Sequence, residues 1–104
     1  MLKIYDVILS MIRRVGGVVP AIERRDVDLA RQLRRAASSV ALNVAEGSGS
    51  KGGIRNARYR TAYGSVKETR ACLDVAEALG YCRIDDELRG ELARVGVALW
   101  KLAV

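Results

Sequence analysis

Three glycines in the middle of the chain have the spacing of a phosphate-binding loop. In the stretch N-V-A-E-G-S-G-S-K-G-G, residues 43–53, Gly47, Gly49 and Gly52 follow the pattern G-x-G-x-x-G, and Lys51 precedes the last of them. Such a loop binds a dinucleotide only where a strand turns tightly into a helix whose amides face the pyrophosphate. A triphosphate-binding loop needs Ser or Thr after its lysine, and here Gly52 follows Lys51. The flanking elements therefore decide what these glycines do.

The residues before the glycines favour a connection between two helices. Apolar residues recur at helical spacing along one stripe, at Leu29, Leu33, Ala36, Ala37, Val40 and Val44. A helix therefore enters the loop, and Gly47 is predicted to take the left-handed conformation that ends it. Gly49, Gly52 and Gly53 are predicted to form a flexible link to the next helix. A nucleotide cradle is the disfavoured alternative.

The residue types leave little support for catalysis. The chain contains no histidine, the side chain that most often performs acid–base work near neutral pH and most often binds transition metals. The acidic cluster Asp85, Asp86 and Glu87 resembles a metal site, but it stands where a helix is predicted to begin, and carboxylates are favoured there by the helix dipole. We therefore expect a protein that is not an enzyme, with no catalytic residue, no metal and no cofactor.

The two cysteines also favour a packing role. On a continuous helix, the ten-residue separation of Cys72 and Cys82 corresponds to roughly 15 Å, too far for a disulfide. Their C-x9-C spacing matches no common metal-ligand pattern. We expect them to be packing residues in a reducing compartment, with a redox pair or half of a metal site as the less favoured alternative.

Helical periodicity and turn residues divide the chain into four segments. Helices are predicted over about residues 2–18, ending near Gly16, Gly17 and Pro20; from Asp26 or Asp28 to about Glu46; over about residues 54–79, closed by Gly80; and from Asp85 onward. Four helices with short connections predict an all-α, antiparallel up-and-down four-helix bundle, with residues 1–104 as a single domain. No signal peptide or membrane span is recognisable, so we expect a cytoplasmic protein without a membrane partner.

The positive charge is concentrated in the middle of the chain. Residues 24–70 contain eleven Lys and Arg against four Asp and Glu, within a net charge of +6 for the whole chain. Arginine suits phosphate recognition, so a nucleic-acid-binding zone is predicted at Arg34, Arg35, Lys51, Arg55, Arg58, Arg60, Lys67 and Arg70. Only Tyr59 and Tyr63 lie in this zone, so base stacking should be minor and contacts to RNA or DNA phosphates weakly sequence-specific. An ordinary solvated charged face is the alternative.

Small residues form a second stripe on each of the two middle helices. They are Ala41 and Ala45 on the first of these helices, and Gly64, Ala71 and Ala78 on the second. A bundle needs to bury only one face of each helix, so a second small or apolar face predicts an interface with other subunits. The alternative is that alanine is simply a good helix former at the surface.

Two stretches resemble a known family. Residues 32–47, Q-L-R-R-A-A-S-S-V-A-L-N-V-A-E-G, and residues 62–81, A-Y-G-S-V-K-E-T-R-A-C-L-D-V-A-E-A-L-G-Y, are similar to its hallmark segments. The family is the bacterial four-helix bundle family that contains proteins encoded by ribosomal RNA intervening sequences and the accessory variability proteins of diversity-generating retroelements. The resemblance covers essentially the whole chain.

The resemblance implies a ring-like homopentamer of four-helix bundles. In the retroelement branch it implies a basic protein that binds nucleic acid and works beside a reverse transcriptase. Within the N-x-A-E-G signature, Asn43, Glu46 and Gly47 are expected to be structural. We expect Asn43 and Glu46 to satisfy backbone groups near the connection or to bond across a subunit boundary.

Two functions remain open from the sequence. The favoured one is a non-enzymatic, ring-forming protein that binds nucleic acid. Its rival is a protein-interaction scaffold that docks an acidic protein, or a structural oligomer, with no nucleic-acid role. Salt-dependent binding to arbitrary RNA and DNA would favour the first function.

Overall fold

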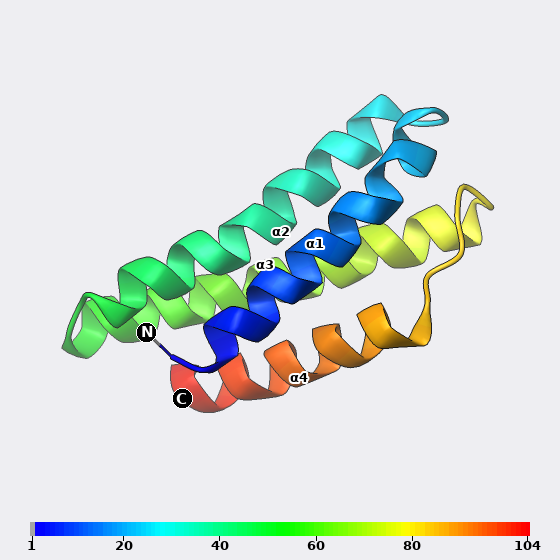
Figure 1. Cartoon of the computed structure of the whole chain (residues 1–104). Helices are drawn as coiled ribbons and strands as arrows, with labels where there is room; N and C mark the ends of the chain where they lie inside the picture. Colours follow the sequence, from blue (N-terminus) through cyan, green and yellow to red (C-terminus); the bar gives the residue numbers. More distant parts are fainter. Residues whose placement is uncertain (1) are drawn as a thin grey trace.

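Four α-helices form an antiparallel bundle in the computed structural model, which describes residues 2–104 (Figure 1). They are α1 (Ile4–Glu23), α2 (Val27–Ser48), α3 (Gly52–Ala78) and α4 (Asp86–Ala103), and residues 2–104 contain no strand. Each helix packs on its neighbour along the chain, and α1 also packs on α4. The predicted all-α architecture of four helices is therefore confirmed.

The core lies where the apolar stripes of the four helices meet. Its largest fully buried side chains include Ile8, Met11 and Ile22 from α1, Leu33 and Val40 from α2, Leu73 from α3, and Leu88, Val95 and Leu99 from α4. Burying one such side chain stabilises the fold by about 1.5–3 kcal/mol relative to leaving it exposed. The 3.6-residue spacing of these positions is the reason that each segment is a helix and not a strand.

The first helix is longer than the sequence predicted. It continues through Gly16, Gly17 and Pro20 to Glu23, whereas an end near residue 18 was expected, and this prediction was wrong. Proline removes one amide donor, but the carbonyl of Gly16 that loses its partner belongs to an exposed residue and can bond to water. Val19 and Ile22, beyond the two glycines, are buried. Tertiary packing thus extends the helix past residues that would end it alone.

The other helix boundaries follow their capping residues. The carboxylate of Asp26 accepts a hydrogen bond from the amide of Leu29 (2.9 Å) at the start of α2. The carboxylate of Asp85 accepts one from Leu88 (2.8 Å) at the start of α4. Gly80, at φ +76°, follows the end of α3. The predicted roles of these three residues are confirmed, because carboxylates cap helix N-termini and glycine tolerates a left-handed conformation after a helix.

Gly47 has a different role from the one predicted. It lies inside the last turn of α2, and the positive φ angle in this connection belongs to Gly52 (+58°). A Cβ atom on Gly47 would lie 2.6 Å from Cε1 and 2.9 Å from Cδ1 of Tyr59 on α3. Gly47 therefore permits the close approach of α3 to α2, and it does not end the helix.

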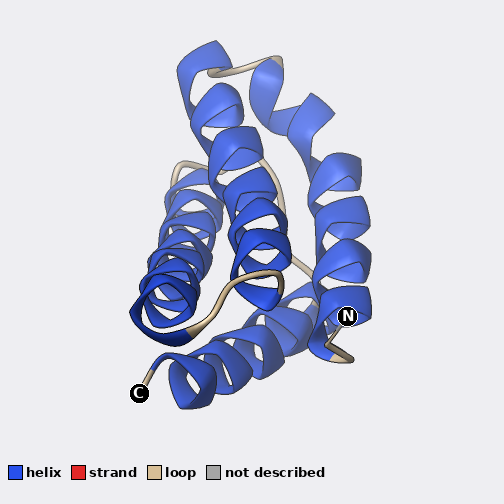
Figure 2. Cartoon of the chain, turned by 90° about the vertical axis from the view of Figure 1, so that its left-hand side faces the viewer, coloured by secondary structure: helices blue, strands red, loops and turns tan. Residues whose placement is uncertain are grey.

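The connection between α2 and α3 lies at the same end of the bundle as both termini (Figure 2). It is short, because α3 already begins at Gly52 rather than at residue 54 as predicted. None of the helices within residues 2–104 contains an apolar stretch long enough to cross a membrane.

Candidate nucleic-acid interface

The eight basic residues singled out by charge all lie exposed on the second and third helices and the connection between them. Arg34 and Arg35 lie on α2, and Lys51 lies in the connection. The remaining five, Arg55, Arg58, Arg60, Lys67 and Arg70, lie along α3. The fold therefore places them on adjacent antiparallel helices, as a shared surface would require, but it does not place all of them on one face.

A shallow groove on α2 and α3 gathers three of these arginines. It is lined by Arg34, Arg35, Ser38, Ser39, Leu42, Asn43, Glu46 and Arg58, and we call it the α2–α3 groove. Three guanidinium groups are thus gathered in one place beside the carboxylate of Glu46, while the hydroxyl of Ser38 and the amide of Asn43 already donate within α2. Such a set can donate several hydrogen bonds to phosphate oxygens.

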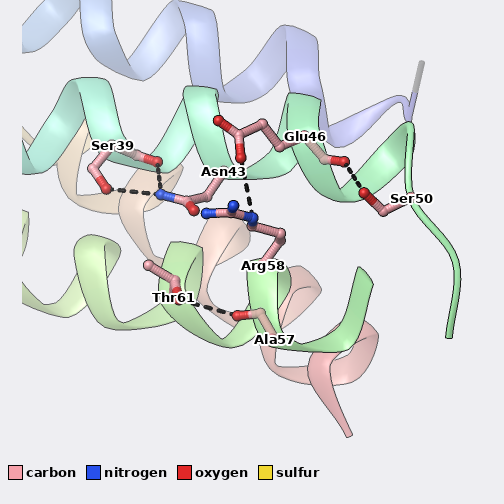
Figure 3. A network of polar contacts seen from close by, with 7 residues as sticks. All are labelled: Ser39, Asn43, Glu46, Ser50, Ala57, Arg58 and Thr61. Carbon is pink, nitrogen blue, oxygen red and sulfur yellow. Dashed lines mark hydrogen bonds and ion pairs between the residues drawn. The ribbon is translucent and has the colours of Figure 1, made fainter. Parts of the chain in front are cut away.

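The polar side chains of the α2–α3 groove are held by a local network (Figure 3). Nδ2 of Asn43 donates to the backbone carbonyl (2.9 Å) and to Oγ (3.0 Å) of Ser39, one turn earlier on α2. The hydroxyl of Ser65 on α3 donates to Oγ of Ser39 (2.8 Å), which joins the two helices. Asn43 thus binds a backbone group within α2, whereas a backbone group near the connection or a group of another subunit was expected.

Glu46 pairs with an arginine instead of with the backbone. Its Oε2 lies 3.0 Å from Nε of Arg58, and both side chains are about half exposed. An exposed pair of this kind contributes only about 0–1 kcal/mol. Arg34 forms a similar exposed pair with Glu23 (3.1 Å). A phosphate can therefore compete with either carboxylate for its arginine at small cost, because the ion pairs themselves are weak.

The other six predicted residues make no salt bridge among residues 2–104. They are Arg35, Lys51, Arg55, Arg60, Lys67 and Arg70. Lys67 instead places its Nζ 5.6 Å from the ring centroid of Tyr63. Because these cations have no carboxylate partner within the described chain, they are the ones most readily available to an anionic ligand.

The third helix divides the predicted zone between two sides of the molecule. Arg58 lines the α2–α3 groove, whereas Lys67 and Arg70 line a larger groove between α3 and α4, together with Tyr63, Val66, Asp74, Arg89, Leu92, Ala93, Gly96, Val97 and Trp100. We call this second surface the α3–α4 groove. The sequence reasoning did not connect Trp100 or Val97 with the basic residues, because only the packing of α4 on α3 brings them together.

The residues predicted to form a subunit interface are divided between the core and the surface. Ala41 is only 7% exposed and belongs to the core of the single chain, so the structure contradicts its placement on an outer stripe. The α2 helix turns Ala41 toward the same side as Leu33, Ala37 and Val44, which pack in the bundle. Ala45 is half-buried.

Gly64, Ala71 and Ala78 remain at the surface of α3. Val75 (46% exposed) and Leu79 (54% exposed) lie on the same side of this helix at helical spacing. These five residues form an exposed apolar surface that we call the α3 small-residue stripe. Its role in assembly stays a prediction.

The buried charged side chain found among residues 2–104 has a structural explanation. Glu91 on α4 is 6% exposed and accepts a hydrogen bond from the hydroxyl of Ser10 on α1. Its Oε1 lies 3.0 Å from Nε of Arg14, which also pairs with Glu87 (2.6 Å). These contacts join α1 to α4 and compensate the carboxylate, so we assign Glu91 no ligand.

Both cysteines are free thiols, as the sequence predicted. Burial raises the pKa of Cys72 and of Cys82, and the nearby carboxylates of Glu68 and Glu77, respectively, act in the same direction. A raised pKa lowers the fraction of reactive thiolate. Among residues 2–104, no group of three or more His, Cys, Asp or Glu side chains is arranged to hold a metal ion.

The chain is similar to a known protein family. A search of curated proteins found no significant match. The sequence profile described as 23S rRNA-intervening sequence protein matches residues 2–101, which is nearly the whole chain. The chain therefore belongs to the 23S rRNA-intervening sequence protein family.

Proposed function

We propose that this protein is a non-enzymatic, basic homo-oligomer that binds nucleic acid through its phosphates. The observation that carries the proposal is the charge of the surface from Leu29 to Lys67. Glu46 is the only acidic residue in this stretch, against the basic residues Arg31, Arg34, Arg35, Lys51, Arg55, Arg58, Arg60 and Lys67. All of these basic side chains are exposed, and the exposed cationic surface they form favours a polyanion.

Assembly would multiply a small number of contacts. If each subunit of the expected homopentamer brings one or two cations to phosphate, the ring neutralises on the order of five to ten phosphates. The family description refers to 23S rRNA, so RNA is the first probe to use. Contacts to phosphate position a protein without reading bases, so sequence preference should be weak.

The test neutralises three cations that make no salt bridge within residues 2–104. The triple variant Arg35→Gln, Arg55→Gln and Arg60→Gln should bind RNA and duplex DNA more weakly, whatever their sequence. The logarithmic salt dependence should flatten by about 0.9 for each duplex phosphate that the variant no longer neutralises. Fluorescence anisotropy over a range of salt concentrations measures both effects. Arg58 is left unchanged because it already pairs with Glu46.

A second triple variant controls for net charge. Arg13→Gln, Arg24→Gln and Arg94→Gln also removes three exposed cations, from α1, the α1–α2 connection and α4. It should retain most of the affinity. Equal weakening by the two triples would mean that the contact surface lies elsewhere. Absence of wild-type binding to RNA and DNA at low salt would overturn the proposal.

A scaffold that docks an acidic protein is the second candidate function. The observation in its favour is the exposed apolar surface of α4, where Val97 is 56% and Trp100 is 55% exposed. Such a protein would bind its partner without affinity for oligonucleotides. The same anisotropy experiment therefore separates the two functions.

Within the nucleic-acid proposal, the cellular role divides into two. One is a role associated with ribosomal RNA, and the other is work beside a reverse transcriptase. The genes that flank this one test the choice, since a ribosomal RNA operon supports the first and a reverse transcriptase gene supports the second.

A further inference from the structure

The α3–α4 groove combines aromatic rings with unpaired cations. It has a volume of about 890 Å³ and runs between Tyr63 and Trp100 at one end and Asp74 and Arg89 at the other. At 1.5 Å per residue, the distance from Tyr63 to Asp74 along α3 is roughly 16 Å. A groove of this length can accommodate a few nucleotides of a single strand.

An aromatic pair is held in place at one end of this groove. The ring centroids of Tyr63 on α3 and Trp100 on α4 lie 5.4 Å apart, with an angle of 53° between the ring planes. Aromatic pairs favour tilted contacts at such distances. Trp100 nevertheless remains 55% exposed. Its indole is therefore positioned by Tyr63 while much of its surface is open to a ligand.

The cations beside the rings have no acidic partner within the described chain. Lys67 lies over the ring of Tyr63, and Arg70 follows one turn later on the same helix. The acidic residue that lines the groove, Asp74, accepts a hydrogen bond from NH1 of Arg89 at 2.6 Å. That acid is thus already paired, and two positive charges remain open beside the aromatic end.

Small residues leave space on the α4 side of the groove. Ala93 and Gly96 line the groove from α4, together with Lys67 and Arg70 from α3, and their small side chains occupy little of it. A Cβ atom added to Gly96 would contact only Val66, at an ordinary 3.9 Å. A flat ring system could therefore lie beside Trp100 without displacing neighbours.

We propose that the α3–α4 groove binds single-stranded nucleic acid by stacking an unpaired base on Trp100, with Lys67 and Arg70 at the adjacent phosphates. Single-strand-binding surfaces combine these two components, an aromatic platform and a positive track. The inference rests on the proposed nucleic-acid function and deepens it, since it gives the protein a preference for unpaired over duplex nucleic acid. Bases inside a duplex are already stacked on one another and cannot lie on the indole.

A nucleotide fits this groove better than an apolar protein segment. An apolar helix covering Trp100 and Val97 would also bury Lys67 and Arg70 without partners, and burying an unpaired charge is costly. A second copy of this chain that uses its own apolar surface meets the same penalty. A nucleotide suits both parts of the groove, because its base can stack on the aromatic ring and its phosphate can pair with the cations.

The single tryptophan of the chain provides a direct readout. Four probes are titrated into the wild-type protein: a short mixed-sequence RNA, its DNA counterpart, an abasic single strand of equal length, and the corresponding duplex. Both base-containing single strands should quench the emission of Trp100 to saturation. The duplex and the abasic strand should bind with little quenching, and the abasic strand should bind roughly tenfold more weakly than its base-containing equivalent.

Variants of Trp100 separate stacking from simple apolar contact. Trp100→Leu should weaken single-strand binding roughly tenfold and leave duplex binding unchanged, whereas Trp100→Phe, which keeps a ring, should recover most of the affinity. The control Val27→Ala removes an exposed apolar side chain from the start of α2, outside both grooves, and should change neither. The Trp100 variants lack the emission of the single tryptophan, so fluorescence anisotropy measures the binding of every variant. Light scattering is also recorded for each.

Several results would overturn this inference while leaving the proposed function standing. They are equal quenching by single strands and duplex, single-strand affinity that survives Trp100→Leu, and loss of the oligomer in that variant, which would make the groove a contact between subunits. Failure of every probe to bind would instead reject the proposed function itself.

Discussion

At Gly47, a hydrogen atom stands where any other residue would carry a Cβ atom 2.6 Å from the ring of Tyr59. That ring is only 4% exposed, and its hydroxyl lies 3.4 Å from Oγ of Ser48. The ring therefore has little freedom to move away. The signature glycine serves the contact between two helices, and the neighbouring signature residues Asn43 and Glu46 bind groups on α2 and α3 around it.

We expect Gly47→Ala to destabilise the fold. Displacing the buried Tyr59 ring should cost about 1–3 kcal/mol, and the higher helix propensity of alanine should recover at most about 1 kcal/mol of this. Chemical denaturation followed by circular dichroism measures the difference. The control Gly16→Ala lies on the exposed side of α1 with no atom within 4 Å of the new Cβ, and it should be neutral or stabilising. Equal stability of the two variants would contradict the role assigned to Gly47.

The sequence identifies Gly47 as special but gives the wrong reason. Glycine after a polar turn is typical of a helix end, and nothing local distinguishes that role from a close approach. The distinguishing residue, Tyr59, lies twelve positions later on the next helix. By contrast, the caps at Asp26 and Asp85 are predictable because each carboxylate bonds to an amide only three residues away.

At the level of the elements, Glu77 joins the end of α3 to the chain that leads into α4. Its Oε2 accepts a hydrogen bond from the amide of Ile84 (2.9 Å), and its Oε1 lies 3.1 Å from NH2 of Arg89. The bond from the Ile84 amide, followed by the Arg89 guanidinium, lowers the pKa of this carboxyl below its ordinary value of 4.5. A lowered pKa means that the folded state favours the charged form.

We therefore expect Glu77 to contribute stability that is lost in acid. A carboxyl whose pKa is lower in the folded state stabilises it above the unfolded-state pKa, and the contribution disappears as the pH falls through the folded-state value. Glu77→Gln should thus be less stable than the wild type at neutral pH, and the difference should shrink as the pH falls below the ordinary value of 4.5 and on through the lower pKa of the folded state. Denaturation curves from neutral to acidic pH measure this difference.

A matched variant controls for the loss of one negative charge. Glu68→Gln changes a carboxylate on the same helix that makes no salt bridge among residues 2–104. Its stability difference from the wild type should depend less on pH. A Glu77→Gln difference that is constant across the acidic range would exclude the assigned linkage.

The number, type and order of the helices are predictable because their apolar stripes repeat over several turns. The end of α1 is not predictable in this way, since the local signals of Gly16, Gly17 and Pro20 oppose the packing of Val19 and Ile22. Tertiary burial prevails there over local propensity. The sequence therefore does not predict a helix boundary that is set by packing against another helix.

For the whole molecule, the α3 small-residue stripe is the surface to test for assembly. Ala71→Glu would place an unpaired charge in an interface on this stripe, and we expect it to dissociate the proposed oligomer while the monomer stays helical. Light scattering and circular dichroism measure the two properties. Ala41, predicted for the same interface, is unsuitable because a charge at this core position would disrupt the fold itself.

The control Gln32→Glu adds the same negative charge on α2, outside the α3 small-residue stripe, and should leave assembly unchanged. A wild-type protein that is monomeric at micromolar concentration would reject the assembly whatever the variants do.

Neither the assembly surface nor the α3–α4 groove can be predicted from the sequence alone, because both depend on which helix faces are left uncovered once the bundle has formed. Charge density along the chain is visible in the sequence, but the approach of Trp100 to Tyr63 across two helices is not.

The antiparallel path of the chain also determines what can be tethered to it. Both termini share one end of the bundle with the α2–α3 connection (Figures 1 and 2), where Lys51 lies and Arg55 follows in the first turn of α3. A domain joined by a flexible linker has its highest effective concentration close to the point where the linker is attached. A tag or fused domain at either terminus would therefore crowd the end that carries these two cations. The α3–α4 connection, at the opposite end, would stay accessible.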